Sequence, residues 1–131
     1  MASHPAFPST PPVSAGVTLT SADNGVWKQV FSCPAGGSGT LVGRLRAVSD
    51  DTAGVSLIAA RNIGGIYYRI GCVTVPAGAG NSAAVAWKDL LADLNLGESL
   101  ALAPSESLCV MPVTNVTAAK TIWLHLEGAP L

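Results

Sequence analysis

Short apolar segments with the length of a β-strand alternate along most of this chain with turns rich in glycine and proline. The segment 40–49, TLVGRLRAVS, is the clearest case, because its side chains alternate with a period of two. That period places Leu41 and Leu45 on one face, as expected for a strand that buries one side. The opposite face then carries Arg44 and Arg46. Segments of the same kind lie at 17–20, 26–32, 55–61, 66–75, 100–102, 108–113 and 121–128.

The number and spacing of these segments predict the fold class. About seven or eight short strands, recurring every 8–12 residues or so, are typical of a sandwich or a closed barrel. Two sheets packed face to face would bury the apolar side chains. We therefore expect an all-β protein, an antiparallel β-sandwich of jelly-roll-like type, with a strongly twisted barrel as the second choice.

One section departs from the strand pattern. Between residues 84 and 94 the apolar side chains lie at helical spacing. Ser82 is a suitable N-cap and Gly97 a suitable helix end. We expect at most one short helix here, at about 84–94. The alternative is a strand at 83–87 followed by an irregular loop.

The first sixteen residues, MASHPAFPSTPPVSAG, form a separate piece. Proline lacks a backbone donor and fixes φ near about −65°, so this composition favours an extended segment, not a helix or a central strand. We expect a Pro-rich N-terminal arm at 1–16, either a disordered tail or an arm along a partner, and a single β-sandwich domain at 17–131. The arm residues expected at an interface are Pro5, Phe7, Pro8, Pro11 and Pro12.

Charge is sparse. Charged residues make up 11% of the chain, against roughly 25% in an average soluble domain, and 49% of residues are hydrophobic. The formal net charge of −1 does not suit a nucleic-acid binder. We interpret the sparse charge as a sign that other protein chains cover much of the surface. The alternative is a compact Ala- and Gly-rich domain that is simply weakly charged.

No apolar run reaches the length of a membrane span, and the N-terminus lacks the cationic start and apolar core of a secretory signal. We therefore expect no membrane partner and synthesis in a cytoplasm. The three cysteines, Cys33, Cys72 and Cys109, contain no C-x-x-C pair that would suit zinc. They are expected to be buried free thiols, the alternative being a thiol that bridges to a neighbouring subunit.

The residue types that carry catalysis are few. Asp50 and Asp51 are adjacent, but such pairs in a loop are expected to be solvated turn residues. His125 lies on the last predicted strand, and a catalytic role would require a nucleophile and an orienting acid. The sequence contains no G-x-S-x-G motif, phosphate-binding loop or paired histidines at metal-ligand spacing. We expect no enzymatic activity, no cofactor and no metal.

Several turn motifs resemble a pattern in small virion proteins of tailed phages. The stretch CPAG followed by GTLVGRLRAVSDDTAGVSLIAAR is similar to its PAG turn and strand pair. VTVPAGAGNSA resembles the second PAG turn. LALAPSESLCV is similar to the closing L-x-L-x-P-G-[DE]-S-L-x-V element, with Ser105 in place of glycine. The resemblance covers about residues 17–128 and brings no catalytic residues.

The resemblance implies a capsid decoration (cement) protein that binds the outside of a phage head at subunit junctions. Its partners would be the major capsid protein and copies of itself, as a trimer or dimer on the virion surface. The alternatives are a tail, fibre or neck component, or a jelly-roll module that binds carbohydrate. Outside the arm, the expected interface residues are Arg44, Arg46, Trp123 and His125. A sugar site would use aromatic side chains from among Trp27, Trp87, Trp123, Tyr67 and Tyr68.

Overall fold

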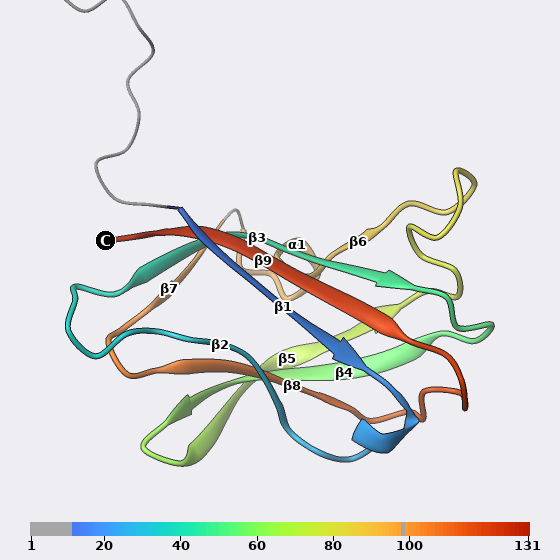
Figure 1. The fold of residues 1–131 in the computed structure, drawn as a ribbon, viewed down its shortest axis with the longest axis horizontal. Coiled ribbons are helices and arrows are strands. Elements are labelled where there is room, and N and C mark those ends of the chain that lie inside the picture. The colour runs from blue at the N-terminus through green and yellow to red at the C-terminus, as the bar shows by residue number, and fades with distance from the viewer. Residues whose placement is uncertain (1–11, 98) are drawn as a thin grey trace, which may run out of the picture.

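The computed structural model describes residues 12–97 and 99–131, and in it two antiparallel sheets pack face to face (Figure 1). One sheet has five strands in the order β1-β9-β3-β6, with β7 also paired to β3, and the other has the order β2-β8-β4-β5. The prediction of an antiparallel β-sandwich is confirmed. The elements are β1 (Val13–Leu19), η1 (Ser21–Asp23), β2 (Lys28–Ser32), β3 (Thr40–Ser49), β4 (Val55–Ile63), β5 (Ile66–Val75), β6 (Lys88–Asp89), α1 (Leu90–Asp93), β7 (Leu100–Leu102), β8 (Ser107–Pro112) and β9 (Ile122–Pro130).

The strand pairing is nested. The first strand pairs with the last, β2 with β8, β3 with β6 and β7, and β4 with β5. This is the pairing of a long antiparallel ribbon that has been folded over into two layers, which is the jelly-roll arrangement. It also brings the chain end beside the start of β1, as Figure 1 shows.

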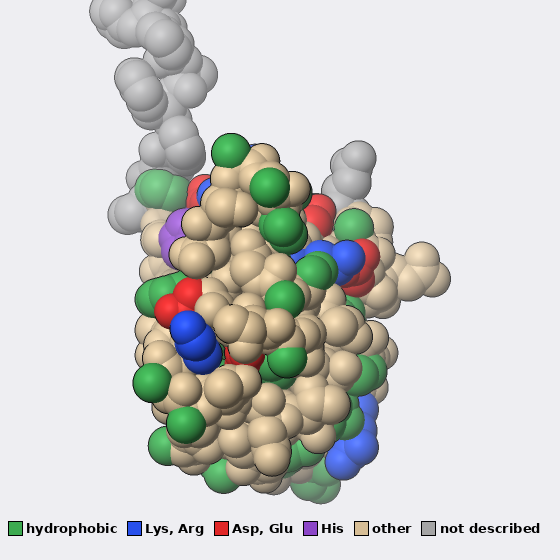
Figure 2. Space-filling view, turned by 90° about the vertical axis from the view of Figure 1, so that its right-hand side faces the viewer, with side chains coloured by type: hydrophobic (Ala, Val, Ile, Leu, Met, Phe, Trp, Pro, Cys, Tyr) green, Lys and Arg blue, Asp and Glu red, His purple; other side chains and the backbone are tan. Residues whose placement is uncertain are grey.

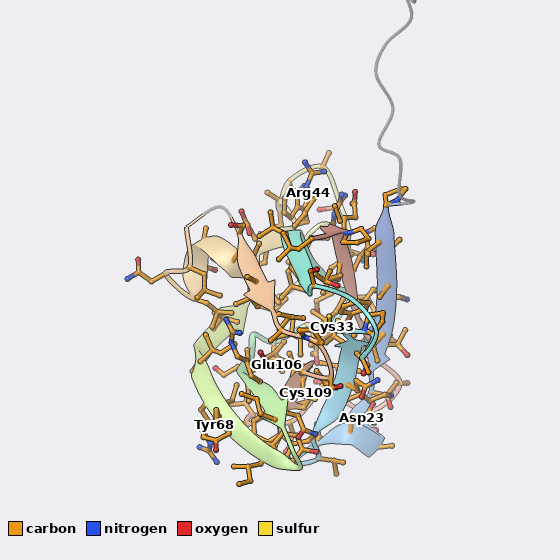
Figure 3. All side chains as sticks on the ribbon, turned by 90° about the vertical axis from the view of Figure 1, so that its left-hand side faces the viewer. Asp23, Cys33, Arg44, Tyr68, Glu106 and Cys109 are labelled. Atoms are coloured by element: carbon orange, nitrogen blue, oxygen red, sulfur yellow. The ribbon has the colours of Figure 1, made fainter. Side chains whose placement is uncertain are left out.

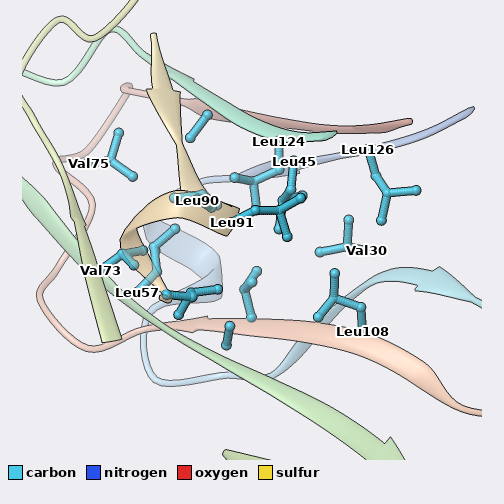
Figure 4. Packing of buried hydrophobic residues seen from close by; sticks show 14 of the residues in the cluster. Val30, Leu45, Leu57, Val73, Val75, Leu90, Leu91, Leu108, Leu124 and Leu126 are labelled. Atoms are coloured by element: carbon cyan, nitrogen blue, oxygen red, sulfur yellow. The ribbon is translucent and has the colours of Figure 1, made fainter. Parts of the chain in front are cut away.

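The core lies between the two sheets and is filled by leucine and valine. Leu45 and Leu126 from the five-stranded sheet and Leu57 and Leu108 from the other sheet are fully buried (Figure 4). Burying each such side chain contributes about 1.5–3 kcal/mol to folding. In β3 and β9 these residues alternate with more exposed residues, as the period-two pattern predicts, whereas in β8 both neighbours of Leu108 are buried as well.

The tight turn between β4 and β5 follows directly from the sequence. Strand β4 ends at Ile63 and β5 begins at Ile66, leaving Gly64 and Gly65 as the two loop residues. Their φ angles are 62° and 88°. A two-residue hairpin whose central residues both have positive φ is a type I′ turn, for which glycine is favoured. The hairpin expected at this NIGG sequence is confirmed.

Strand β3 has the predicted bounds but not the predicted faces. A β-bulge between Val42 and Arg44, opposite β9, shifts the alternation. As a result Val42 is buried and Leu41 is exposed, whereas Leu45 still points inward. The prediction that Leu41 and Leu45 share one face was wrong, because the period-two rule fails across an inserted residue.

The predicted helix is much shorter than expected. Helix α1 spans only Leu90–Asp93, and residues 84–87 are not helical. Its N-cap is Asp89, not Ser82, because the Asp89 carboxylate accepts hydrogen bonds from the amides of Leu91 and Ala92. Leu90 and Leu91 then turn into the core beside Leu45 (Figure 4). An Asp at this position is a strong cap, and here it overrides the helical spacing upstream.

The first strand begins earlier than predicted. Residues 13–16, placed in the arm by the sequence, belong to β1 and pair with β9 from Gly128 to His125. Ala and Gly gave this segment little strand character, and pairing supplies it instead. Pro12 is exposed. The other arm residues proposed for an interface lie outside the described residues: Pro5, Phe7, Pro8 and Pro11.

Candidate functional site

A polar network lies on the outer face of the five-stranded sheet. The Ser14 hydroxyl is 3.1 Å from Nε2 of His125, and Nδ1 of the same ring is 3.4 Å from Oε1 of Glu127. That carboxylate oxygen also accepts a 2.8 Å hydrogen bond from Arg46. Ser14 stands opposite Glu127 in the β1–β9 register, and Arg46 stands opposite His125 in the β9–β3 register. Strand pairing alone therefore assembles the network.

The order hydroxyl, imidazole, carboxylate is that of a serine hydrolase, so its chemistry needs a test. Such a site requires donors that stabilise an oxyanion and a cavity that excludes water. Here the side chains of His125 and Glu127 are 44% and 43% exposed, and neither of the two pockets described below is lined by Ser14. We interpret the network as surface contacts. The absence of enzymatic activity remains a prediction.

The structure brings together the four predicted interface residues of the folded domain. Arg44, Arg46, Trp123 and His125 all project from the outer face of the β1-β9-β3 layer. Arg44 points away from the body of the domain at the far end from Tyr68 (Figure 3). The bulge in β3 does not separate the arginines, because Arg44 and Arg46 both follow it.

Arg46 connects this network to Trp87. Its guanidinium carbon lies 5.1 Å from the centre of the Trp87 ring, a cation–π contact. With the Glu127 carboxylate holding Nη2 of the same guanidinium, the Arg46 side chain is fixed at both sides. The Trp87 ring is therefore held in position although it is 42% exposed.

Beside Trp87 lies a pocket of about 380 Å³. It sits along β3 between the short strands β6 and β7 and is roofed by α1. The pocket combines a guanidinium (Arg44), a carboxylate (Asp89) and an indole (Trp87) with small residues. The lining residues are Gly43, Arg44, Trp87, Asp89, Leu91, Ala92 and Gly97. From the sequence, Trp87 was only one of five aromatic candidates; the break in the strand pattern between 76 and 99 was the signal that something other than regular sheet stands here.

A second pocket, of about 320 Å³, is apolar. It lies at the end of the sandwich where β1 begins and β9 ends. Val13, Phe31, Pro130 and Leu131 provide apolar walls, and the glycine-rich loop 36–39 closes the remaining side. Because Val13 is the first residue of β1, that strand begins at the rim of this pocket.

The outer face of the β2-β8-β4-β5 sheet differs from the polar face opposite it. Ile58 stands opposite Met111 on one side and Cys72 on the other, forming an uncharged row across three strands. Trp27 and Tyr67 stack on the same face. Among the described residues of these four strands that point outward, away from the core, Arg69 is the one charged residue. The same face also carries uncharged polar side chains, among them Ser56 and Thr74, whose hydroxyl oxygens lie 3.1 Å apart. We call this surface, after its uncharged row, the apolar sheet face.

The end of the sandwich formed by the loops after β3, β5 and β8 is also sparsely charged (Figure 2). At its base is Asp51, which is 1% exposed. Burial acts to raise the pKa of Asp51, but hydrogen bonds from the amide and hydroxyl of Thr117 (2.8 and 2.7 Å) and from the amide of Ala53 outweigh it and lower the pKa. The prediction that Asp51 is a solvated turn residue was wrong, because its carboxylate joins two loops.

The cysteines divide into two kinds. Cys33 and Cys109 are buried free thiols, and burial raises the pKa of Cys109. Cys72 is exposed, so the expectation of buried thiols was wrong for this residue, because its side chain shares the outer face of the sheet with that of Ile58. Within residues 12–97 and 99–131, no three His, Cys, Asp or Glu side chains lie close enough to hold a metal ion. In the same part of the chain, no helix has the length and apolarity that crossing a membrane requires.

No protein-family model, curated protein or solved structure matches this chain. Three surfaces of the described domain are therefore its candidate functional sites. These are the apolar sheet face, the apolar pocket at the root of the N-terminal segment, and the Trp87 pocket.

Proposed function

We propose that this chain is a structural protein of a tailed-phage particle that binds the outside of the head as a decoration protein. The proposal rests on one observation above the others, the apolar sheet face. A free monomer gains nothing from an uncharged row such as Met111, Ile58 and Cys72 in contact with water, whereas a protein that lies against a shell buries it. The jelly-roll fold occurs in viral capsid proteins but also in lectins, so the fold supports the proposal only weakly.

The two sheets give the domain distinct sides. Glu127, Arg46 and His125 make the outer face of the five-stranded sheet polar, while Arg69 alone carries charge on the apolar sheet face. A decoration protein placed on the shell through its apolar sheet face would keep its polar face in solvent. Arg69 would then favour an acidic group on the shell surface, and the contact would weaken with salt.

The apolar pocket supports the proposed contact between copies of this protein. The sequence predicts an extended Pro-rich segment before Val13, with Phe7 as its one aromatic side chain. Consecutive prolines at 11 and 12 oppose a sharp return to the pocket at its own root. We therefore propose that Phe7 of one copy fills the pocket of its neighbour. Phe7→Ala is expected to shift the protein towards monomer in sedimentation, and Thr10→Ala is the control. Unchanged oligomeric state in Phe7→Ala would remove the arm from the proposal.

Heads assembled without this chain provide the direct test. The purified protein is expected to co-sediment with heads of the phage that encodes it and to raise their melting temperature. Ile58→Lys places a charge in the apolar sheet face and should weaken binding at least tenfold. Thr18→Lys places the same charge on an exposed position of the other sheet and should not. Circular dichroism checks that both variants fold.

Two results would overturn this proposal. One is a wild-type protein that binds no heads. The other is equal binding by Ile58→Lys and wild type. Labelled antibodies on whole particles distinguish the alternative, since staining of the tail, fibres or neck would assign the chain to those parts instead of the head.

A further inference from the structure

Strand β3 has an unfilled stretch along one edge. On its first side it pairs with β9 over its whole length. On its other side, residues 40–42 pair with β7 and residues 46–47 pair with β6, but residues 43–45 have no strand partner. Helix α1 and the loop after it separate β6 from β7 and arch over this stretch. Main-chain groups of β3 therefore face a space that a regular strand would fill in an ordinary jelly roll.

The Trp87 pocket lies at this break. Gly43 forms part of its lining and has open space above it, since an added Cβ would meet its nearest neighbour, the Glu127 carbonyl oxygen, only at 4.0 Å. Arg44 and Asp89 bring one positive and one negative side chain to the same pocket. Within the described residues, Arg44 takes part in none of the ion pairs, and its guanidinium carries five N–H donors.

The aromatic wall of the pocket is held in place before any ligand arrives. Arg46 stacks on Trp87, and Glu127 holds Arg46 from the other strand. The Cβ of Trp87 also packs close to Gly80, whose φ of 68° only glycine adopts readily. A fixed indole loses little conformational entropy when a ligand stacks on it.

We propose that this pocket binds a neutral hexose unit of an oligosaccharide. A pyranose ring has an apolar C–H face, which suits Trp87, and a rim of hydroxyl groups that both donate and accept. The Arg44 guanidinium donates to such hydroxyls, and Oδ2 of Asp89 accepts from them, while Oδ1 of the same carboxylate caps α1. The two opposite charges suit a neutral ligand better than an ionised one. A volume of about 380 Å³ is within the usual range for small-ligand sites.

This inference does not depend on the proposed role in a phage head. The residues that line the pocket come from β3, β6, α1 and the segments beside them, and none belongs to the strands that carry the apolar sheet face. A protein attached to a shell through that apolar face would display the pocket to the medium, and a protein with no shell partner would display it as well.

A glycan array carrying neutral and acidic oligosaccharides tests the proposal on the full-length protein. Trp87→Ala and Arg44→Gln are expected to reduce binding of neutral glycans at least tenfold. Trp123→Ala is the matched control, because Trp123 is 42% exposed, as Trp87 is, and lies on the same sheet outside the pocket. Its binding should equal that of wild type.

Three outcomes would overturn the proposal. The first is a wild-type protein that binds no glycan on the array. The second is an equal loss of binding in Trp123→Ala and Trp87→Ala, which would place the contact elsewhere on the sheet. The third is binding of acidic glycans alone, which would exclude a neutral sugar as the ligand. Trp87→Ala removes a large side chain and could lose binding by misfolding. Arg44→Gln removes only a surface charge, so a loss of binding in Arg44→Gln reports on the pocket itself.

Discussion

Trp27 stacks on Tyr67 across the outer face of the four-stranded sheet, with ring centroids 4.6 Å apart and ring planes 5° from parallel. The two residues come from opposite edges of that sheet, because Trp27 immediately precedes β2 and Tyr67 lies in β5. Between these edges, Ala60 and Cys109 are almost fully buried although they alternate with core residues along their strands. We infer that the aromatic pair covers them and joins the two edge strands outside the core.

Removing one member of this pair should destabilise the domain. Trp27→Ala loses the stacking, worth about 0.5–1.5 kcal/mol beyond the buried area, together with the area itself. We expect the free energy of unfolding in urea to fall by about 2 kcal/mol or more. Tyr68→Ala is the control, since Tyr68 is 52% exposed and should change stability little. Equal stability of Trp27→Ala and Tyr68→Ala would contradict the inferred role of the stack.

A close contact between the backbones of β9 and β3 requires glycine at position 128. A Cβ on Gly128 would collide with the carbonyl oxygen of Leu41, at the position of the bulge. Backbone atoms paired on both sides cannot move aside, so Gly128→Ala should cost about 3 kcal/mol or more. Gly16→Ala is the comparison, because its Cβ would reach its nearest neighbour, the Leu124 carbonyl oxygen, at 3.4 Å. Thermal melts compare the two variants. A much larger fall in melting temperature for Gly128→Ala than for Gly16→Ala would show that the close backbone contact, and not the loss of a glycine, causes the destabilisation.

The stability of the fold should depend on pH through Asp51. Its folded-state pKa is lowered from the ordinary value of 3.8, so the ionised form stabilises the fold above that value. Stability should be lost as the pH falls below about 3.8 and through the lower folded pKa. In Asp51→Asn an uncharged amide replaces the carboxylate that accepts the hydrogen bond from the Thr117 N–H. We expect the free energy of unfolding to fall by about 2–3 kcal/mol at pH 7.

Urea unfolding at pH 7 and at pH 3 measures this dependence. The difference between the two pH values should be smaller for Asp51→Asn than for wild type. The pKa of Asp23 is also lowered, chiefly by a hydrogen bond from the Thr20 amide. Asp23 therefore contributes to the pH dependence of stability, and this contribution should remain in Asp51→Asn. An unchanged difference in Asp51→Asn would show that the pH dependence arises from other groups.

The thiols should react in two classes. Cys72 is exposed, whereas burial of Cys33 and Cys109 protects them, and the raised pKa of Cys109 further reduces its thiolate fraction. A thiol reagent at pH 8 is expected to modify Cys72 rapidly in the native protein and the other two only on unfolding. Cys72→Ser should remove the fast phase. A fast phase that persists in this variant would mean that one buried cysteine is reached by solvent.

Local patterns predicted much of the fold. The alternation at 40–49 located β3 with its full bounds, and the β-branched and aromatic residues at 66–75 did the same for β5. The two glycines at 64 and 65 located the hairpin between β4 and β5. These features depend on neighbouring residues alone, through side-chain period and backbone φ. The same reasoning failed at the bulge after Val42, because an extra residue in one strand is specified by its partner strand and leaves no local period to detect.

The candidate sites were less accessible to such reasoning. Arg44, Arg46, Trp123 and His125 were expected to share an interface, and the pairing of β3 with β9 does place them on one face. Ser14 was not considered, because its segment had been placed in the arm. Nor could the sequence predict the partners of Asp51, since Thr117 lies far along the chain in another loop.

The sequence by itself determined that the chain is a sandwich of short strands with few charges, because strand periodicity and turn chemistry act over neighbouring residues. Only the tertiary structure decided which faces those strands present. The nested pairing of strands distant in sequence left one sheet face with a single charge among the described residues and gave the other face an ion-paired network. It also interrupted the strand pairing along β3 near Trp87 and placed the apolar pocket at the start of β1. Each of these features depends on which strands become neighbours in a sheet, and the packing of residues far apart in the sequence decides which strands do so.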